Sequence, residues 1–142
     1  HGNRGAILGI LVLVHGHFGR KENHLPVSER FCAIGFRCLL FDVLDHGEHP
    51  SPTTTFALNE AMLPRAVLES AAQRFGFDPR PAGLFVALSL GGAIALIAAV
   101  QERDADIHSV VAELSSFAIL SQVIEHEARR FGPLSRPTAA LM

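Results

Sequence analysis

The stretch Ala87-Leu88-Ser89-Leu90-Gly91-Gly92 decides the fold, because it joins a strand-sized apolar run to a helix-sized one. The run 83–88 is short and apolar, as in a buried strand, and the run 93–100 has the composition of a buried helix. A serine between two such elements, with small residues around it, is typical of a sharp turn that exposes its hydroxyl. A helix N-cap serine beside packing glycines is the other interpretation of the same residues.

Outward from this turn, strand-like and helix-like segments alternate. Continuous apolar runs predict buried strands, and apolar residues at helical spacing predict helices. The strands are predicted at Ala6–Val14, Phe36–Asp42, Gly83–Leu88 and His108–Leu114, and the helices at Asn23–Ile34, Phe56–Phe75 (with Pro64 starting a new turn or a kink), Leu90–Gln101 and Phe117–Phe131. The alternation predicts an α/β fold, a three-layer and mainly parallel sheet with helices on both faces.

The uncharged stretch Pro81–Val100 is long enough for a membrane-spanning helix, which needs about 17–25 apolar residues. The alternative is a buried strand followed by a buried helix. Ser89, Gly91 and Gly92 interrupt a helix in the middle of this stretch, where a bilayer requires it to be continuous. We therefore predict a buried strand followed by a buried helix, and no membrane span.

Composition and charge exclude further classes of protein. The 142 residues are 49% hydrophobic and 18% charged, which predicts a folded domain with its own core. The net charge is -2 and the basic residues are scattered, so no basic stripe is present for nucleic acid.

Cys32 and Cys38 lack metal or disulfide spacing and are predicted to be buried free thiols. No signal-peptide pattern is visible, which favours a cytoplasmic location.

Ser89 is the candidate nucleophile. It follows a strand and precedes a helix, so we expect its hydroxyl at the carboxyl edge of the sheet, beside outward-pointing backbone N–H groups. A bulky residue two positions before or after it would collide with the adjoining elements, and Ala87 and Gly91 meet this steric requirement.

A second candidate element is the loop His15-Gly16-His17-Phe18-Gly19, which follows the first strand. A glycine-containing loop can direct backbone N–H groups towards an anion. The N–H of Leu90 and one from His17 or Phe18 are therefore candidates for an oxyanion hole, in which each donor is worth about 2.7–4 kcal/mol.

Three segments in this order resemble the α/β-hydrolase superfamily over essentially the whole chain: Val12-Leu13-Val14-His15-Gly16, then Leu40-Phe41-Asp42 followed by His46-Gly47, then Ala87-Leu88-Ser89-Leu90-Gly91-Gly92. The resemblance implies that the four strands lie in the spatial order second, first, third, fourth. It also implies that the His15-Gly16 loop lies beside the Ser89 turn. Ala87 stands where the family usually has its first elbow glycine.

The resemblance further implies a serine hydrolase of carboxylic esters or related acyl compounds, with a small-molecule substrate and no cofactor. The family's acid and histidine follow the serine in the order Ser, Asp or Glu, His. We expect both beyond Met142, so that residues 1–142 form a single core domain, incomplete at both ends. The alternative is a non-catalytic member that binds a small molecule or a protein. The implied site has Ser89 as nucleophile, Leu90 with His17 or Phe18 as oxyanion donors, and a supporting motif of His15, Gly16, Ala87, Gly91 and Gly92.

Other polar residues are weaker candidates. His46 and His49 resemble the family's structural turn, His126 is expected on a solvated helix face, and Glu113 ends a strand where a few lipases place their acid. A zinc site from His15-x-His17 and Asp45-His46-x-x-His49 is disfavoured, because a whole helix and strand separate the two elements. No dinucleotide or Walker phosphate motif is present in the sequence.

Overall fold

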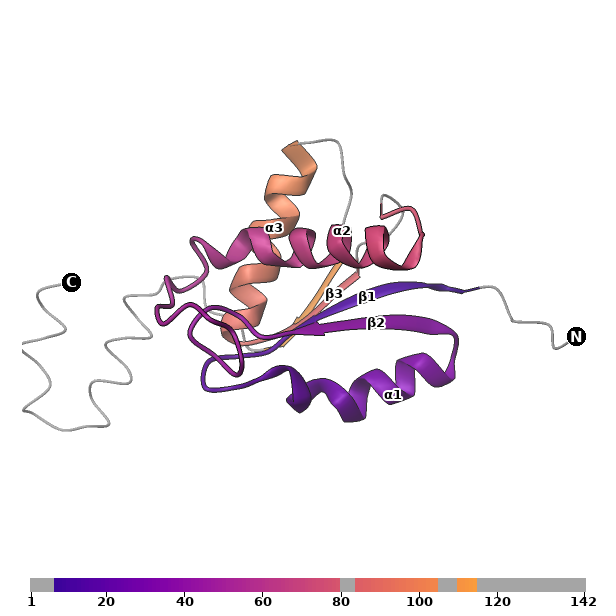
Figure 1. Ribbon diagram of the computed structural model, residues 1–142, viewed down its shortest axis with the longest axis horizontal. Helices are drawn as coiled ribbons and strands as arrows, with labels where there is room; N and C mark the ends of the chain where they lie inside the picture. Colours follow the sequence, from indigo (N-terminus) through magenta and orange to yellow (C-terminus); the bar gives the residue numbers. More distant parts are fainter. Residues whose placement is uncertain (1–6, 80–83, 105–109, 115–142) are drawn as a thin grey trace, which may run out of the picture.

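The computed structural model describes residues 7–79, 84–104 and 110–114. Strands and helices alternate, as predicted (Figure 1). The strands are β1 (Gly9–Val14), β2 (Phe36–Phe41), β3 (Leu84–Leu88) and β4 (Val110–Leu114), and the helices are α1 (Leu25–Ala33), α2 (Leu63–Phe75) and α3 (Leu90–Asp104). All four predicted strands are confirmed, with bounds that differ by a few residues. The helix predicted at Phe117–Phe131 lies outside the described residues.

The four strands form one parallel sheet in the order β2-β1-β3-β4. This is the spatial order second, first, third, fourth. Val14 lies opposite Phe41 on one side and opposite Ala87 on the other. The topology therefore reverses between β1 and β3, which is where open α/β sheets bind their ligands.

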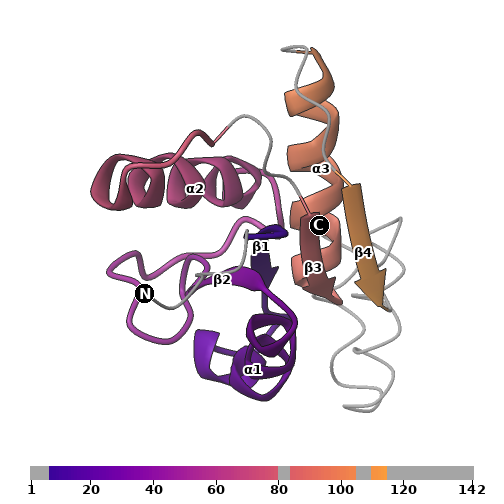
Figure 2. The same ribbon diagram turned by 90° about the vertical axis from the view of Figure 1, so that its right-hand side faces the viewer.

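Helices cover both faces of this sheet. Helix α1 lies on one face, whereas α2 and α3 lie on the other (Figures 1 and 2). This is the arrangement that right-handed crossovers require, because the chain moves one way from β1 to β2 and the opposite way from β2 to β3 and β4. The predicted three-layer architecture is confirmed.

The core is built around the central strand β1. Leu11, Val12, Leu13 and Val14 have no exposed surface, as expected for a strand with helices over both faces. Side chains of α2 and α3 pack against this strand and its neighbours. The main cluster of buried apolar residues comprises Val12, Val14, Val43, Ala57, Leu68, Ala87, Leu90, Ala93, Ile94, Ala95 and Ala98.

Two helix starts differ from the sequence prediction. Helix α1 begins at Leu25, after a short 3₁₀ turn at Lys21–His24. Helix α2 begins at Leu63 and not at Phe56, after a 3₁₀ turn at Glu60–Met62. Pro64 lies in the first turn of α2, where a backbone N–H has no acceptor within the helix. Its lack of an N–H therefore costs no helical hydrogen bond, and Pro64 starts the helix and does not kink it.

The long uncharged stretch is divided between two elements. Its described part contains strand β3 and the first turns of α3. Within the described ranges, no helix combines the length and apolar character needed to cross a bilayer.

The prediction of buried thiols is wrong for Cys32. Both cysteines are free, but Cys32 is exposed and Cys38 is half-buried. Cys32 lies on the last turns of α1, a helix whose one buried residue is Ser28, and this short helix leaves that position open to solvent.

Candidate active site

The candidate site lies where β1 and β3 end side by side. Val14 is paired with Ala87, so the positions two residues further on, Gly16 and Ser89, face each other. A Cβ atom built on Gly16 would lie 3.3 Å from Cβ of Ser89 and 3.0 Å from the carbonyl oxygen of Leu88. The loop after β1 and the turn after β3 are therefore in direct contact.

Ser89 has an unusual backbone conformation. Its φ of +53° lies in the left-handed region, which costs a residue with a side chain about 1–3 kcal/mol. The carbonyl of Ser89 accepts hydrogen bonds from the N–H groups of Gly92 (2.9 Å) and Ala93 (3.3 Å), which fixes the first turn of α3. The chain thus reverses sharply at Ser89, between the last residue of β3 and the first of α3.

Gly91 allows α3 to start this close to the sheet. A Cβ atom at this position would collide with the backbone carbonyl oxygens of Val14 and His15. Ala87, on the other side of Ser89, is 4% exposed and lies in the main apolar cluster. Small residues at both positions are thus a geometric requirement of the turn.

The loop after β1 turns tightly beside Ser89. The N–H of Gly19 donates to the carbonyl of Gly16 (3.0 Å), and Phe18 has a φ of +61°. The Phe18 side chain is 93% exposed. On the other side of the contact, Leu90 is the first residue of α3, and an N–H at that position has no acceptor within its helix.

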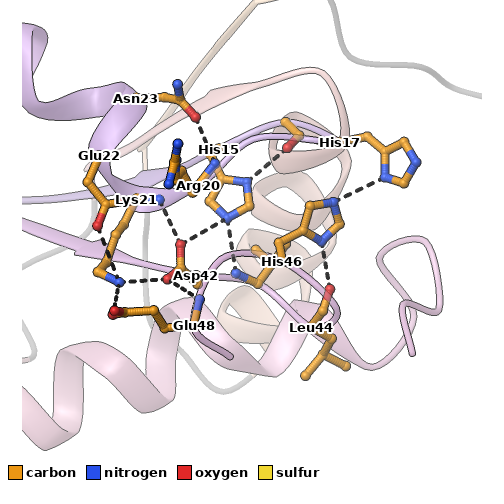
Figure 3. A network of polar contacts seen from close by, with 12 residues as sticks. His15, His17, Arg20, Lys21, Glu22, Asn23, Asp42, Leu44, His46 and Glu48 are labelled. Atoms are coloured by element: carbon orange, nitrogen blue, oxygen red, sulfur yellow. Dashed lines mark hydrogen bonds and ion pairs between the residues drawn. The ribbon is translucent and has the colours of Figure 1, made fainter. Parts of the chain in front are cut away.

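His15 is a structural residue of this loop. Its Nδ1 lies 2.8 Å from the carbonyl oxygen of Gly16, and its Nε2 accepts the N–H of Val43 at 3.1 Å (Figure 3). Because Nε2 accepts, Nδ1 is the protonated nitrogen and the ring is neutral. Burial lowers the pKa of His15, which favours the same neutral form. The 3.8 Å separation of Nε2 from Asp42 is therefore not an ion pair.

His17 and His46 form a pair that sequence reasoning missed. His46 Nδ1 lies 2.7 Å from the carbonyl oxygen of Leu44, and its Nε2 lies 3.2 Å from Nδ1 of His17 (Figure 3). The Leu44 carbonyl can only accept, so in the neutral pair His46 donates to it and His17 donates to His46. Within the described residues, neither histidine is hydrogen-bonded to Ser89. The pair links two loops 29 residues apart in sequence, and no local pattern encodes that contact.

Asp42 holds together the chain segments that follow β1 and β2. It accepts hydrogen bonds from the backbone N–H (2.7 Å) and the Nζ (2.7 Å) of Lys21, and from the N–H of Glu48 (3.0 Å) (Figure 3). Burial disfavours its charged form, but the bonds from Glu48 and Lys21 outweigh burial and lower the pKa of Asp42 to about 2. The carboxylate is thus a structural ion that fixes the end of β2.

Glu60 is a second buried carboxylate that the sequence did not single out. It has no exposed surface and accepts hydrogen bonds from the N–H groups of Thr55 (2.6 Å) and Ala57 (3.0 Å) and the hydroxyl groups of Thr54 (2.8 Å) and Thr55. These bonds hold Phe56 and Ala57 at positive φ, which is why no α-helix begins at Phe56. The ring of Phe56 lies 5.5 Å from that of His17, so this loop reaches the site.

The remaining candidates are placed as follows. Ser51 donates its N–H to His49 Nδ1 (3.1 Å), in a surface turn. Glu113 is on β4 opposite Ala87. His126 lies outside the described residues. Among the residues that are described, no group of three or more His, Cys, Asp or Glu is arranged to hold a metal ion.

The order of the strands, the single reversal of topology and the serine turn define an α/β-hydrolase core. The chain matches the model of the alpha/beta hydrolase family over residues 11–141, and it belongs to that family. No curated protein sequence matches the chain.

Solved structures with the same fold include several hydrolases. AbyA5 matches 86% of this chain with 34% of its own length, at 19% identity and a TM-score of 0.66. A monoacylglycerol lipase from Paleococcus ferrophilus matches 87% of the chain with 48% of its length (23% identity, TM-score 0.60). A bacterial heroin esterase matches 81% with 38% of its length (21% identity, TM-score 0.58). The chain thus spans about a third to a half of these proteins, and the likeness shows a shared fold.

Proposed function

We propose that this chain supplies the nucleophile and the oxyanion-binding loops of a serine hydrolase that acts on carboxylic esters or related acyl compounds. The observation that carries the proposal is the position of Ser89: a non-glycine residue at φ +53°, at the carboxyl end of a central strand and in contact with the loop after β1. Backbone strain of this kind is retained where it serves a function.

The geometry disfavours the N-cap interpretation of Ser89. An N-cap residue normally has extended backbone angles, and its side-chain oxygen accepts an N–H from the first turn. Ser89 is left-handed, and the N–H of Gly92 is donated to its backbone carbonyl. This arrangement favours a hydroxyl that is available for reaction over one that caps the helix.

In the proposed reaction, Ser89 Oγ attacks the acyl carbonyl and a tetrahedral oxyanion forms. The N–H of Leu90 and one N–H from His17 or Phe18 donate hydrogen bonds to this oxyanion. A histidine later in the sequence takes the serine proton and an acid orients that histidine, in the family's order. The acyl-enzyme is then hydrolysed by water.

The substrate class rests on two supports. The relatives of known fold include a monoacylglycerol lipase and a heroin esterase. The rim of the candidate site also carries an exposed aromatic side chain, Phe18, next to His17, with a centroid distance of 3.9 Å between their rings. An apolar surface beside the serine suits the acyl or alcohol part of an ester better than a charged substrate.

The test is fluorophosphonate labelling of the full-length gene product, because the proposed mechanism needs its later histidine and acid, followed by peptide mapping. We expect the label on Ser89 and a loss of at least about 100-fold in labelling rate for Ser89→Ala. Ser70→Ala, which removes an exposed serine on α2, is the matched control and should label like the parent. Labelling that survives Ser89→Ala would overturn the proposal. A folded protein that neither labels nor hydrolyses esters would favour the non-catalytic binding alternative.

A further inference from the structure

Two free cysteines lie on neighbouring elements, the helix α1 and the strand β2. Cys32 is on α1 and Cys38 is on β2, the strand that α1 packs against. The Sγ of Cys38 lies 3.7 Å from the carbonyl oxygen of Ser28, also on α1. The Cys38 side chain therefore points at one particular turn of the helix.

That turn also holds Cys32. In an α-helix a carbonyl accepts the N–H four residues further on, so the carbonyl of Ser28 is shared with the N–H of Cys32. Helical side chains lean towards the N-terminus of their helix, which brings the Cys32 side chain back over this turn. The Cys32 thiol is near enough to Cys38 to help raise the pKa of the Cys38 thiol.

The two sulfurs differ in access to solvent. Cys32 is exposed, whereas Cys38 is half-buried between helix and strand. Burial, together with the adjacent Cys32 thiol, raises the pKa of Cys38 to about 11. Only the thiolate attacks a disulfide, so the exposed Cys32 is the thiol that an external reagent meets first.

We propose that Cys32 and Cys38 form a dithiol modification site, which low-molecular-weight disulfides such as glutathione disulfide oxidise to an internal disulfide. In the first step the Cys32 thiolate attacks glutathione disulfide, which gives a mixed disulfide on Cys32 and releases one glutathione thiolate. In the second step the Cys38 thiolate attacks Sγ of Cys32 and releases the second glutathione. The two cysteine thiols are oxidised by two electrons, and one glutathione disulfide is reduced to two glutathione molecules.

Burial of the Cys38 thiol slows its attack in the second step near neutral pH, because burial disfavours the thiolate. The mixed disulfide on Cys32 forms first, and its closure accelerates as rising pH deprotonates Cys38. A pair of unrelated surface thiols would instead give two independent adducts.

The experiment treats the purified, reduced protein with glutathione disulfide over a range of pH and follows the products by intact mass and peptide mapping. We expect a monomer that has lost two hydrogens and contains a Cys32–Cys38 linkage, formed faster at higher pH and reversed by dithiothreitol. Cys38→Ser should stop at a stable glutathione adduct on Cys32. Cys32→Ser should react more slowly than the parent at the same pH.

Three results would overturn the proposal: a parent protein that keeps two free thiols, one that ends with a glutathione on each cysteine, or one that forms only intermolecular disulfides. The mapping of the parent protein does not depend on either variant folding. The outcome is also independent of Ser89, because the labelling of that serine is a separate measurement.

Discussion

Gly16 and Ser89 touch across the ends of β1 and β3, so closely that a single methyl group on Gly16 would lie 3.3 Å from Cβ of the serine. The pairing of Val14 with Ala87 brings them together, because Gly16 and Ser89 each lie two residues after their paired strand residue. Because of this contact, a substitution that moves the loop after β1 should also shift the serine turn. A substitution in the serine turn should likewise shift the loop.

Gly16→Ala tests this contact. The added Cβ would lie 3.0 Å from the carbonyl oxygen of Leu88, which is tight enough to push the loop away by a few tenths of an ångström. Because misplacement of catalytic groups by about 1 Å can cost about 100-fold in rate, we expect fluorophosphonate labelling of Ser89 to slow by about tenfold. Gly9→Ala is the matched control, since its Cβ would meet only the ring of Phe36 at 3.4 Å. Equal labelling rates in the two variants would contradict the prediction.

Gly91→Ala should act on stability. The new Cβ would overlap the carbonyl oxygens of Val14 and His15, which belong to the buried central strand and its immediate continuation and have little room to move. Overpacking of this kind costs about 1–3 kcal/mol, and a clash with backbone lies at the upper end. Urea denaturation should show a fall of about 3 kcal/mol in the free energy of unfolding. A loss below about 0.5 kcal/mol would mean that α3 can start further from the sheet.

Much of this fold could be predicted from the sequence, because hydrophobic pattern and topology rules act together. The run 6–14 is apolar at every position except Gly9, which matches a strand buried on both faces, and Leu11–Val14 are fully buried. The strand order needed the resemblance to the family, since alternation alone leaves several orders open.

The parts that could not be predicted depend on contacts between distant loops. His17 and His46 are 29 residues apart, and nothing near either one indicates the other. The segment before α2 has helical periodicity. The Glu60 carboxylate nevertheless accepts hydrogen bonds from the N–H groups of Thr55 and Ala57, and the backbone there stays irregular. Local hydrogen bonds of this kind compete with helix formation, and periodicity does not detect them.

Glu60→Gln should destabilise the loop beside the site. The buried carboxylate accepts from four N–H and O–H groups, and an amide would turn its own donors towards some of them. The expected loss is about 1–3 kcal/mol in the free energy of unfolding, measured by urea denaturation near neutral pH. Glu69→Gln is the matched control: Glu69 is 53% exposed and bound only to Arg65 within its helix, so the change should cost less than about 0.5 kcal/mol.

The same glutamate predicts a pH dependence. Burial raises the pKa of Glu60, but the hydrogen bonds from Thr55 and Thr54 outweigh it, and the pKa is lowered from 4.5. The folded carboxyl therefore holds its proton more weakly than the unfolded one. Its contribution to stability is complete above pH 4.5 and is lost as the pH falls through the folded pKa. Glu60→Gln should remove this part of the acid dependence; acid profiles of equal slope would contradict it.

The last prediction concerns His15. Burial lowers its pKa from 6.5, and its Nε2 is committed to accepting the N–H of Val43. Below pH 6.5 the unfolded chain binds a proton that the folded ring resists, so the contribution of His15 to stability is complete above that pH and falls as the solution is acidified. His15→Gln and His15→Phe should both flatten the stability profile between about pH 7.5 and about pH 5. They should differ at the upper end, because Gln can still accept from Val43 whereas Phe leaves that N–H unpaired at a cost of about 1–3 kcal/mol. Parallel profiles for the parent and both variants would show that His15 takes up its proton equally in the folded and unfolded states.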